Sequence, residues 1–205
     1  LRSVPQGGFA PLRTRRSIVA NFTKQAIKAS FMKLLSQKPL SKISVRDIVE
    51  DCGINRNSFY YHFQDIPSLL GEIVAEQTDE LIRQYPSISS VEECFSVAFH
   101  TARENRRAVM HIFNSANRDV FLHDTMRLCE YVVSTYMATA FPDAAITAED
   151  RRVVVQFMKC QLFGVWIDWV SGGMKEESLA DLRRMLQLCR GVPELIVAHS
   201  SGQRA

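Results

Sequence analysis

Apolar residues recur every three or four positions along most of this 205-residue chain, and that period predicts helices. From residue 87 onward no segment alternates apolar and polar residues as a strand would. The pattern predicts an all-α protein of about nine helices. They are expected at about residues 14–38, 44–53, 55–62, 65–85, 91–104, 107–116, 120–140, 147–170 and 178–191.

Two short predicted helices around a tight turn, residues 43–63, form the most informative stretch. Ser44 is a good N-cap residue, and Asp47 stands three positions later, as in a capping box. Gly53 ends the first helix, because glycine adopts a left-handed C-cap conformation without steric cost. Asn55 can then cap a second helix that runs to about His62. This arrangement is typical of a helix-turn-helix unit.

The second short helix has an unusual outer face. Phe59 and Phe63 are four residues apart and are expected to point inward together. A solvated helix face is usually built of lysine and glutamate, whereas this one holds a guanidinium, an amide and aromatic hydroxyls without any acid. Such a composition suits a helix that lies in a DNA groove. The outward residues are Arg56, Asn57, Ser58, Tyr60, Tyr61 and His62.

The charge of the chain is divided unevenly. The formal net charge is +3, but residues 1–63 carry eleven lysines and arginines against three acids, a net of +8, and the remainder carries a net of −5. A basic first third indicates contact with a polyanion. The alternative is a solvated basic face. Together with the two-helix pattern, the charge favours nucleic acid.

Composition bounds the compartment. With 46% hydrophobic residues the chain can bury a large core. The early prolines and glycines interrupt any apolar leader, and polar residues interrupt the apolar run at 153–170, so neither is expected to enter a membrane. The cysteines are odd in number and widely spaced, as expected for buried thiols in a reducing cytoplasm. They are Cys52, Cys94, Cys129, Cys160 and Cys189.

The signature residues of the first third resemble the TetR-like (TetR/AcrR) transcriptional regulators. They are the Val-Arg-Asp-Ile run at 45–48, Gly53, and the Phe-Tyr-Tyr-His-Phe run at 59–63. The resemblance is strong over about residues 12–72 and architectural beyond. The FQDIPSLL sequence at 63–70, together with the later Trp and Gly-Gly-Met sequence, resembles the branch near the dihydroxyacetone-kinase regulators. Four segments are expected: a disordered tail at 1–12, a helix-turn-helix domain at 13–64, a helical effector-binding and dimerisation domain at 65–198, and a disordered tail at 199–205.

The resemblance implies a role for each residue of the reading unit. Side chains expected to face base edges are Arg46, Arg56, Asn57 and Tyr60. Those expected to hold the DNA backbone are Arg13, Arg15, Arg16, Ser44, Asn55, Ser58, Tyr61 and His62. As alternatives, Tyr60 or Tyr61 fills the core, and His62 is a cation at a helix C-terminus. The family usually has a lysine where this chain has Ile66, so one phosphate contact is expected to be missing.

The segment at 153–170 is apolar on two sides, so one side is expected to face another chain. One stripe holds Val153, Phe157, Cys160, Gly164 and Ile167. The other stripe, joined by the last helix, is predicted to form a four-helix interface in a homodimer; the alternative is an ordinary internal core. The predicted interface residues are Val154, Met158, Leu162, Val165, Trp169, Leu179, Leu182, Leu186 and Cys189.

The middle helices are expected, by the resemblance, to surround a cavity for a small-molecule effector. Its candidate lining is Phe95, Phe99, His100, Met110, Phe113, Met126, Tyr136, Phe157 and Gln161. The alternative is plain core. Zinc would suit Cys94, His100, His111 and His123, but no pair of them has an i, i+4 spacing, so no metal or cofactor is predicted.

Three functions compete. The first is a homodimeric repressor that a small molecule releases from a palindromic double-stranded DNA operator. The second is a co-activator or adaptor whose acidic helical domain binds a protein, with the weaker DNA grip that Ile66 suggests. The third is an enzyme, which is not predicted because the sequence has no nucleophile elbow, zinc-protease motif, phosphate loop or dinucleotide fingerprint.

Overall fold

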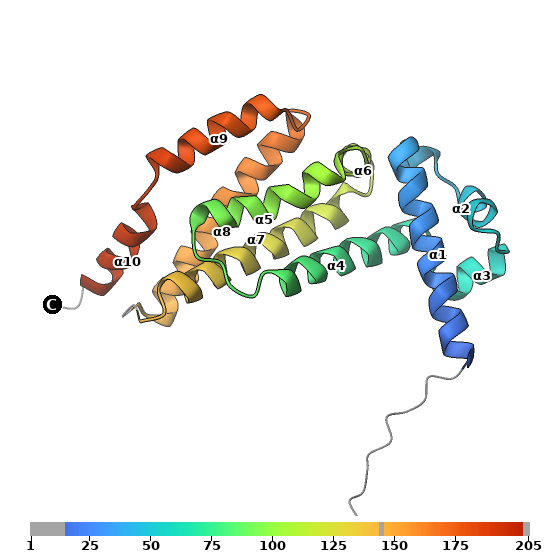
Figure 1. Ribbon diagram of the computed structural model, residues 1–205, viewed down its shortest axis with the longest axis horizontal. Helices are drawn as coiled ribbons and strands as arrows, with labels where there is room; N and C mark the ends of the chain where they lie inside the picture. The colour runs from blue at the N-terminus through green and yellow to red at the C-terminus, as the bar shows by residue number, and fades with distance from the viewer. Residues whose placement is uncertain (1–14, 144–145, 203–205) are drawn as a thin grey trace, which may run out of the picture.

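The computed structural model describes residues 15–143 and 146–202, and in these residues the chain forms ten α-helices and one 3₁₀ helix, without a strand (Figure 1). The all-α prediction is confirmed. The α-helices are α1 (Arg15–Gln37), α2 (Val45–Cys52), α3 (Arg56–His62), α4 (Ile66–Gln84), α5 (Val91–Glu104), α6 (Arg106–Phe113), α7 (Arg118–Ala140), α8 (Ala148–Ser171), α9 (Glu176–Leu188) and α10 (Val192–Gly202), and the 3₁₀ helix is η1 (Leu40–Lys42).

Helix α10 is the main departure from the predicted element order. The pattern predicts no helix after residue 191, yet α10 begins one residue later. Gly191 has a φ of 86°, a left-handed conformation that turns the chain between α9 and α10. Pro193 lies in the first turn of α10, where a missing backbone N–H has no intrahelical partner to lose. Here proline begins a helix instead of ending one.

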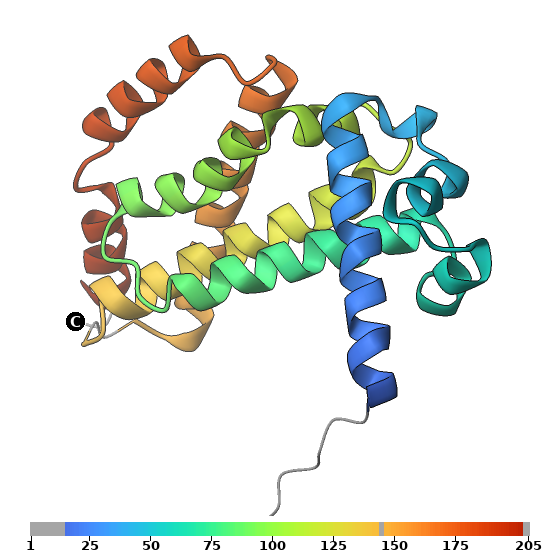
Figure 2. The ribbon, with the colours of Figure 1, turned by 45° about the vertical axis from the view of Figure 1, so that its right-hand side comes forward.

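The buried apolar residues fall into two clusters. The first, which we call the head, joins α1, α2, α3 and the first half of α4; its core includes Ile27, Phe31, Leu35, Ile48, Phe59 and Leu69. The second, the body, joins α5, α7, α8 and α9 with the ends of α4 and α10; its core includes Phe99, Val132, Met137, Leu162, Trp166 and Trp169. Figure 2 shows the head at one end of α4 and the body along the rest of it.

Three helices contribute to both cores: α4, α6 and α7, whose Phe121 packs against each cluster. In α4, Leu70 and Ile73 lie in the head core and Leu81 packs against the body core. In α6, Ala108 and Ile112 lie in the head core, whereas Val109 lies in the body core. Helix α6 is therefore wedged between head and body, and it packs against α1.

The contact between α6 and α1 includes a hydrogen bond that completes the end of α1. The carbonyl of Leu35 would normally accept from the backbone N–H four residues later, but that residue is Pro39, which has none. His111 Nδ1 lies 2.6 Å from this carbonyl oxygen. The His111 ring of α6 thus replaces the backbone N–H donor that Pro39 lacks.

Ion pairs hold α1 against α4 inside the head. Lys28 is a lysine with 6% of its surface exposed, and its Nζ pairs with Glu72 and, at 2.7 Å, with Glu76. Lys24 pairs with Glu72 at 2.7 Å. A buried ammonium is stable when it is paired, so α1 is fixed to α4 in one register.

Helix α8 is long and apolar enough, by length and composition alone, to cross a membrane. Its inner face nevertheless belongs to the body core, where Leu162, Trp166 and Val170 are buried. Lys159 on the same helix pairs with Glu130 of α7 at 2.6 Å. These contacts place the inner face of α8 in the body core.

The prediction that the cysteines are buried holds for only two of the five. Cys94 and Cys129 lie inside the body, and burial raises the pKa of each thiol to about 12. Cys52 is half-buried, whereas Cys160 and Cys189 are exposed. The exposed pair lies on the outer face of α8 and at the end of α9, faces that the helical period alone does not assign to the outside.

Candidate nucleic-acid interface

Three local devices fix the geometry of α2 and α3. The Ser44 hydroxyl and the Asp47 carboxylate form a reciprocal capping box at the start of α2. Gly53 ends α2 with a φ of 68°, which a side-chain-bearing residue would adopt only with strain. The Asn55 side chain accepts from the backbone N–H of Ser58 at 2.8 Å and begins α3. The helix-turn-helix unit is confirmed, with the predicted caps.

The outer face of α3 is presented as predicted. Phe59 and Phe63 anchor the helix, with 0% and 4% of their surfaces exposed. Tyr60 and Tyr61 are 56% and 75% exposed, so neither fills the core. Arg56 is exposed and has no hydrogen bond or ion pair among the residues that the structure describes. An unpaired guanidinium at the start of an anchored helix is available to an outside acceptor.

Some predicted contact residues already have partners within the head. Arg46 Nε donates to Glu50 at 2.7 Å along α2, and the pairing raises the pKa of Arg46. The Ser44 hydroxyl lies 2.7 Å from an Asp47 oxygen. The Ser58 hydroxyl donates to Asn55 at 3.1 Å. Each of these would exchange a protein partner for a DNA partner, which reduces the net gain.

A hollow of about 400 Å³ lies between α1 and α3 and brings together several predicted backbone contacts. Arg13 lies outside the described residues, and of Arg15 and Arg16 the structure gives the backbone in α1. The hollow is lined by Ala20, Thr23, Asn55, Asn57, Ser58, Tyr61 and His62. Amides, hydroxyls and an imidazole around one recess suit the oxygens of a DNA backbone.

Ile66 and Lys24 are two residues of the head whose surroundings bear on the candidate interface. Ile66 begins α4 and packs, half-buried, against the head core, so this position adds apolar contact where a lysine would reach phosphate. Lys24, which the sequence analysis missed, lies 5.6 Å from the centroid of the Phe63 ring and close to His62. Lys24 stands four residues before Lys28, so the sequence alone places both lysines on one face of α1.

His62, the last residue of α3, has a pKa below its ordinary value. The first cause is burial, and the neighbouring Lys24 ammonium adds to it, while Glu72 acts in the opposite direction. The ring is therefore mainly neutral at pH 7. The alternative in which His62 serves as a helix C-terminal cation is disfavoured, and a neutral ring N–H remains able to donate to phosphate.

The body contains cavities among its helices. A cleft of about 400 Å³ between α5 and α9 takes Phe95, Phe99 and His100 from the predicted pocket. A second cavity of about 380 Å³ beneath α9 and α10 takes Tyr136, Phe157 and Gln161, and Phe95 again. A small one of about 60 Å³ lies where α4, α7 and α8 meet. Met110, Phe113 and Met126 line none of these three cavities. The residues predicted to line one pocket are therefore divided between separate cavities, and three of them line none of the three.

The predicted dimer residues differ in their burial within the chain. Leu162, Trp169, Leu179 and Leu186 are buried in the core of their own body, so they cannot form a face for a second chain. Val154, Met158, Val165 and Leu182 are half-buried against that core, and Cys189 is exposed. The exposed large apolar residues of this end are Val153, Phe157, Leu188, Val192 and Leu195.

The considered zinc ligands are separated by the fold. Cys94 is buried in the body core, His100 pairs with Glu104 at 3.5 Å, and His111 is bonded to Leu35. Among the residues that the structure describes, no three histidine, cysteine or acidic side chains converge as metal ligands would.

Comparison with known proteins links both halves of the chain to one class. The model described as "Bacterial regulatory proteins, tetR family" matches residues 29–73, and the one described as "Transcriptional regulator C-terminal region", the TetR_C_8 model, matches residues 89–191. The solved structure of the dihydroxyacetone kinase operon activator DhaS is 18% identical, with a TM-score of 0.63; the match covers 82% of this chain and 98% of that one. Salmonella enterica GusR is 15% identical, with a TM-score of 0.57, covering 85% and 97%. At these identities the structures share the fold.

The environment of His62 predicts its titration. Because burial and Lys24 lower its pKa, the native state takes up a proton less readily than the unfolded chain, so this group's stabilising effect is present above the ordinary pKa and is lost as the pH falls below it. In an NMR pH titration the His62 ring should titrate below pH 6.5, the ordinary value. Lys24→Met should raise the midpoint without restoring 6.5, because burial remains. A midpoint at or above 6.5 in the wild type would contradict the described environment.

Proposed function

This chain belongs to the tetR family of bacterial regulatory proteins, and from that premise we propose that it is a cytoplasmic homodimeric repressor which a small molecule releases from its operator. That it is a transcriptional regulator with a DNA-binding helix-turn-helix follows from the family and the fold. The observation that supports DNA reading is the outer face of α3, anchored by Phe59 and Phe63 and led by an unpaired Arg56.

Base reading is assigned to the outer face of α3. The N-terminal residues of a recognition helix contact base edges, and Arg56, Asn57 and Tyr60 are all exposed there. An arginine fork can bond the O6 and N7 atoms of guanine together, and an amide suits adenine. Arg46 is a weaker candidate, because Glu50 already holds it. Tyr61 and His62, beside the hollow between α1 and α3, are assigned to the backbone.

A homodimer would supply the second recognition helix. One short helix reads few base pairs, so helix-turn-helix proteins commonly bind two half-sites with two-fold symmetry. The exposed apolar side chains at the far end of the body, including Phe157 at 55% and Val153 at 53%, are candidates for the contact between copies. They come from α8, the end of α9 and α10. We therefore propose that the exposed stripe of α8 and the exposed residues of α10 form the dimer face.

The path from body to head runs through α6. Arg103 of α5 pairs with Glu176 of α9 at 2.8 Å, and Arg106 of α6 donates to the Gly173 carbonyl at 2.7 Å. These contacts fix the turn between α8 and α9 against the start of α6. At its other end α6 reaches α1 through His111. A ligand that favours one position of α5 or α9 would shift α6, and with it the spacing of two recognition helices.

Activation is the alternative direction of control. One similar structure is by name an operon activator. Half-buried Ile66 leaves the start of α4 without a phosphate-binding lysine, which favours a protein that also needs a partner to hold DNA. Binding to random duplex with a steep salt dependence and without a preferred sequence would favour this alternative.

Arg56→Ala should reduce the discrimination between bases at one position of each half-site. Losing a bidentate contact to guanine should remove about 1–3 kcal/mol of discrimination there. Operators would be selected from a random duplex pool with the wild type, and the affinities of single-base variants measured by gel shift. If Arg56→Ala left the discrimination at every position intact, Arg56 would not read a base.

Tyr61→Phe is the matched control for that experiment. Tyr61 is 75% exposed beside the hollow, and its hydroxyl is assigned to the DNA backbone. Removing the hydroxyl should lower affinity by a similar factor on all duplexes, because phosphate contacts carry no sequence information.

Phe157→Glu should convert the dimer to a monomer, because a carboxylate would be buried at the proposed contact. Sedimentation equilibrium would report the mass. Phe22→Glu is the matched control, because Phe22 on α1 is 73% exposed and lies in the head, away from α8. A wild-type protein that sediments as a monomer, or a Phe157→Glu variant that remains dimeric, would contradict this interface.

A further inference from the structure

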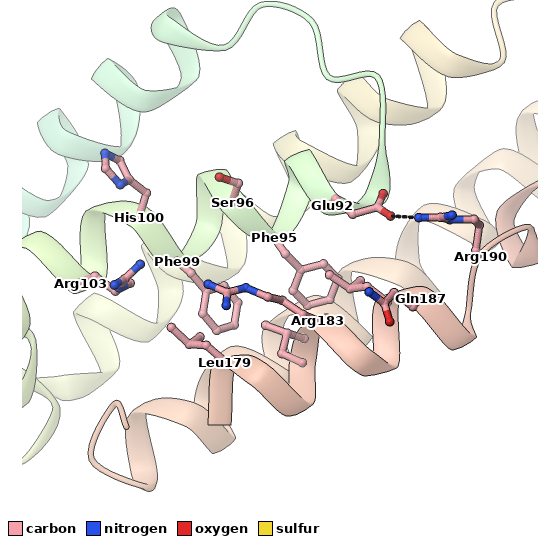
Figure 3. Close-up of a pocket in the computed structure, with 12 residues that line it drawn as sticks. Glu92, Phe95, Ser96, Phe99, His100, Arg103, Leu179, Arg183, Gln187 and Arg190 are labelled. Carbon is pink, nitrogen blue, oxygen red and sulfur yellow. Dashed lines mark ion pairs between the residues drawn. The ribbon is translucent and has the colours of Figure 1, made fainter. Parts of the chain in front are cut away.

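The cleft between α5 and α9 combines an apolar floor with a cationic rim (Figure 3). Phe95 and Phe99 of α5 form the floor, with ring centroids 5.9 Å apart, and Leu179 and Leu186 of α9 face them. All four are buried or nearly so. The rim contains His100, Arg103, Arg183 and Arg190. The volume of about 400 Å³ lies in the range of small-molecule sites.

The positive charge in this cleft is not balanced by its own acids. Glu92 is the acid that lines it, and Glu92 is 3.9 Å from Arg190. Arg103 forms an ion pair with Glu176, which does not line the cleft. Arg183 has no acidic partner among the residues that the structure describes. Figure 3 shows its side chain extending from α9 toward the side of Arg103.

The surroundings make this concentration of arginines more informative. The chain after residue 63 carries fourteen lysines and arginines against nineteen acids, a net of −5. Three arginines around the buried rings of Phe95 and Phe99 therefore form a local positive field within a part of the chain that is acidic overall.

We propose that this cleft binds a linear amphiphilic carboxylate. The carboxylate would lie between Arg103 and Arg183, and the apolar chain would follow Phe99, Phe95 and Leu186 toward the other end of the cleft. Arginine suits a planar two-oxygen head group, and the phenylalanines and leucines gain from covering an alkyl chain. The site lies within one chain and is of small-molecule size, so a small ligand fits it better than a protein helix.

This inference rests on the proposed function for its consequence, because the amphiphile would be the effector. A carboxylate at Arg103 would compete with Glu176 for the same guanidinium. Loss of that pair would loosen the turn between α8 and α9, which Arg106 also holds at Gly173. The next element along the path is α6, whose His111 contacts α1.

Calorimetric titration of the full chain with decanoate, below its micelle concentration and at low salt, tests the site. Decanoate should bind at least tenfold more tightly than decanol, which lacks the charge, and than acetate, which lacks the chain. Arg183→Ala should weaken decanoate binding at least tenfold and leave decanol binding unchanged. Arg184→Ala is the matched control: it removes the same charge one position along α9, from a residue that does not line the cleft.

Equal binding of decanoate and decanol, or equal losses in Arg183→Ala and Arg184→Ala, would overturn the proposal. Gel shifts with the selected operator separate this result from the proposed function. Operator binding without decanoate binding would overturn the cleft assignment and leave the regulator intact. Decanoate binding to the cleft by a protein that binds no operator would support the cleft and contradict the proposed function.

Discussion

The docking of α6 against α1 is the contact on which the arrangement of the molecule depends. Pro39 deprives the carbonyl of Leu35 of its helical donor, and His111 lies 2.6 Å from that oxygen. Ile112, one residue further along, is 4% exposed inside the head core. Helix α4 runs through both parts, and Phe121 of α7 also packs against the head core. The contact between α6 and α1 adds a further attachment, through which we propose that a displacement in the body reaches the head.

The head and the body differ in net charge and in how their cationic side chains are paired. In the basic head, Lys24 and Lys28 are occupied by Glu72 and Glu76, so they serve the junction of α1 with α4. The guanidinium of Arg56 remains outward on α3, among amides and hydroxyls. In the acidic body, arginines gather at the cleft between α5 and α9. The two regions that we propose to attract anions are thus the outer face of α3 and the cleft between α5 and α9.

Local signals in the sequence predicted what local physics determines. The capping box at Ser44, the left-handed Gly53 and the buried pair of Phe59 and Phe63 all follow from residues within a few positions of one another. Choices that depend on distant partners were not predictable. Helix α8 is apolar on two sides, and the packing of α5 and α7, far away in sequence, decides that Leu162 faces inward and Phe157 outward. The division of the pocket has the same origin, because it depends on where α9 and α10 lie.

The central claim is that head and body form one cooperative unit through α6, and denaturant unfolding followed by two probes tests it most directly. Both tryptophans, Trp166 and Trp169, lie in the body core, so their fluorescence reports the body, whereas far-ultraviolet circular dichroism reports every helix. The two curves should coincide for the wild type. Ile112→Ala, which removes about 2–5 kcal/mol of packing at the junction, should separate them. Curves that are already separate in the wild type, or that stay coincident in Ile112→Ala despite a loss of that size, would contradict the account.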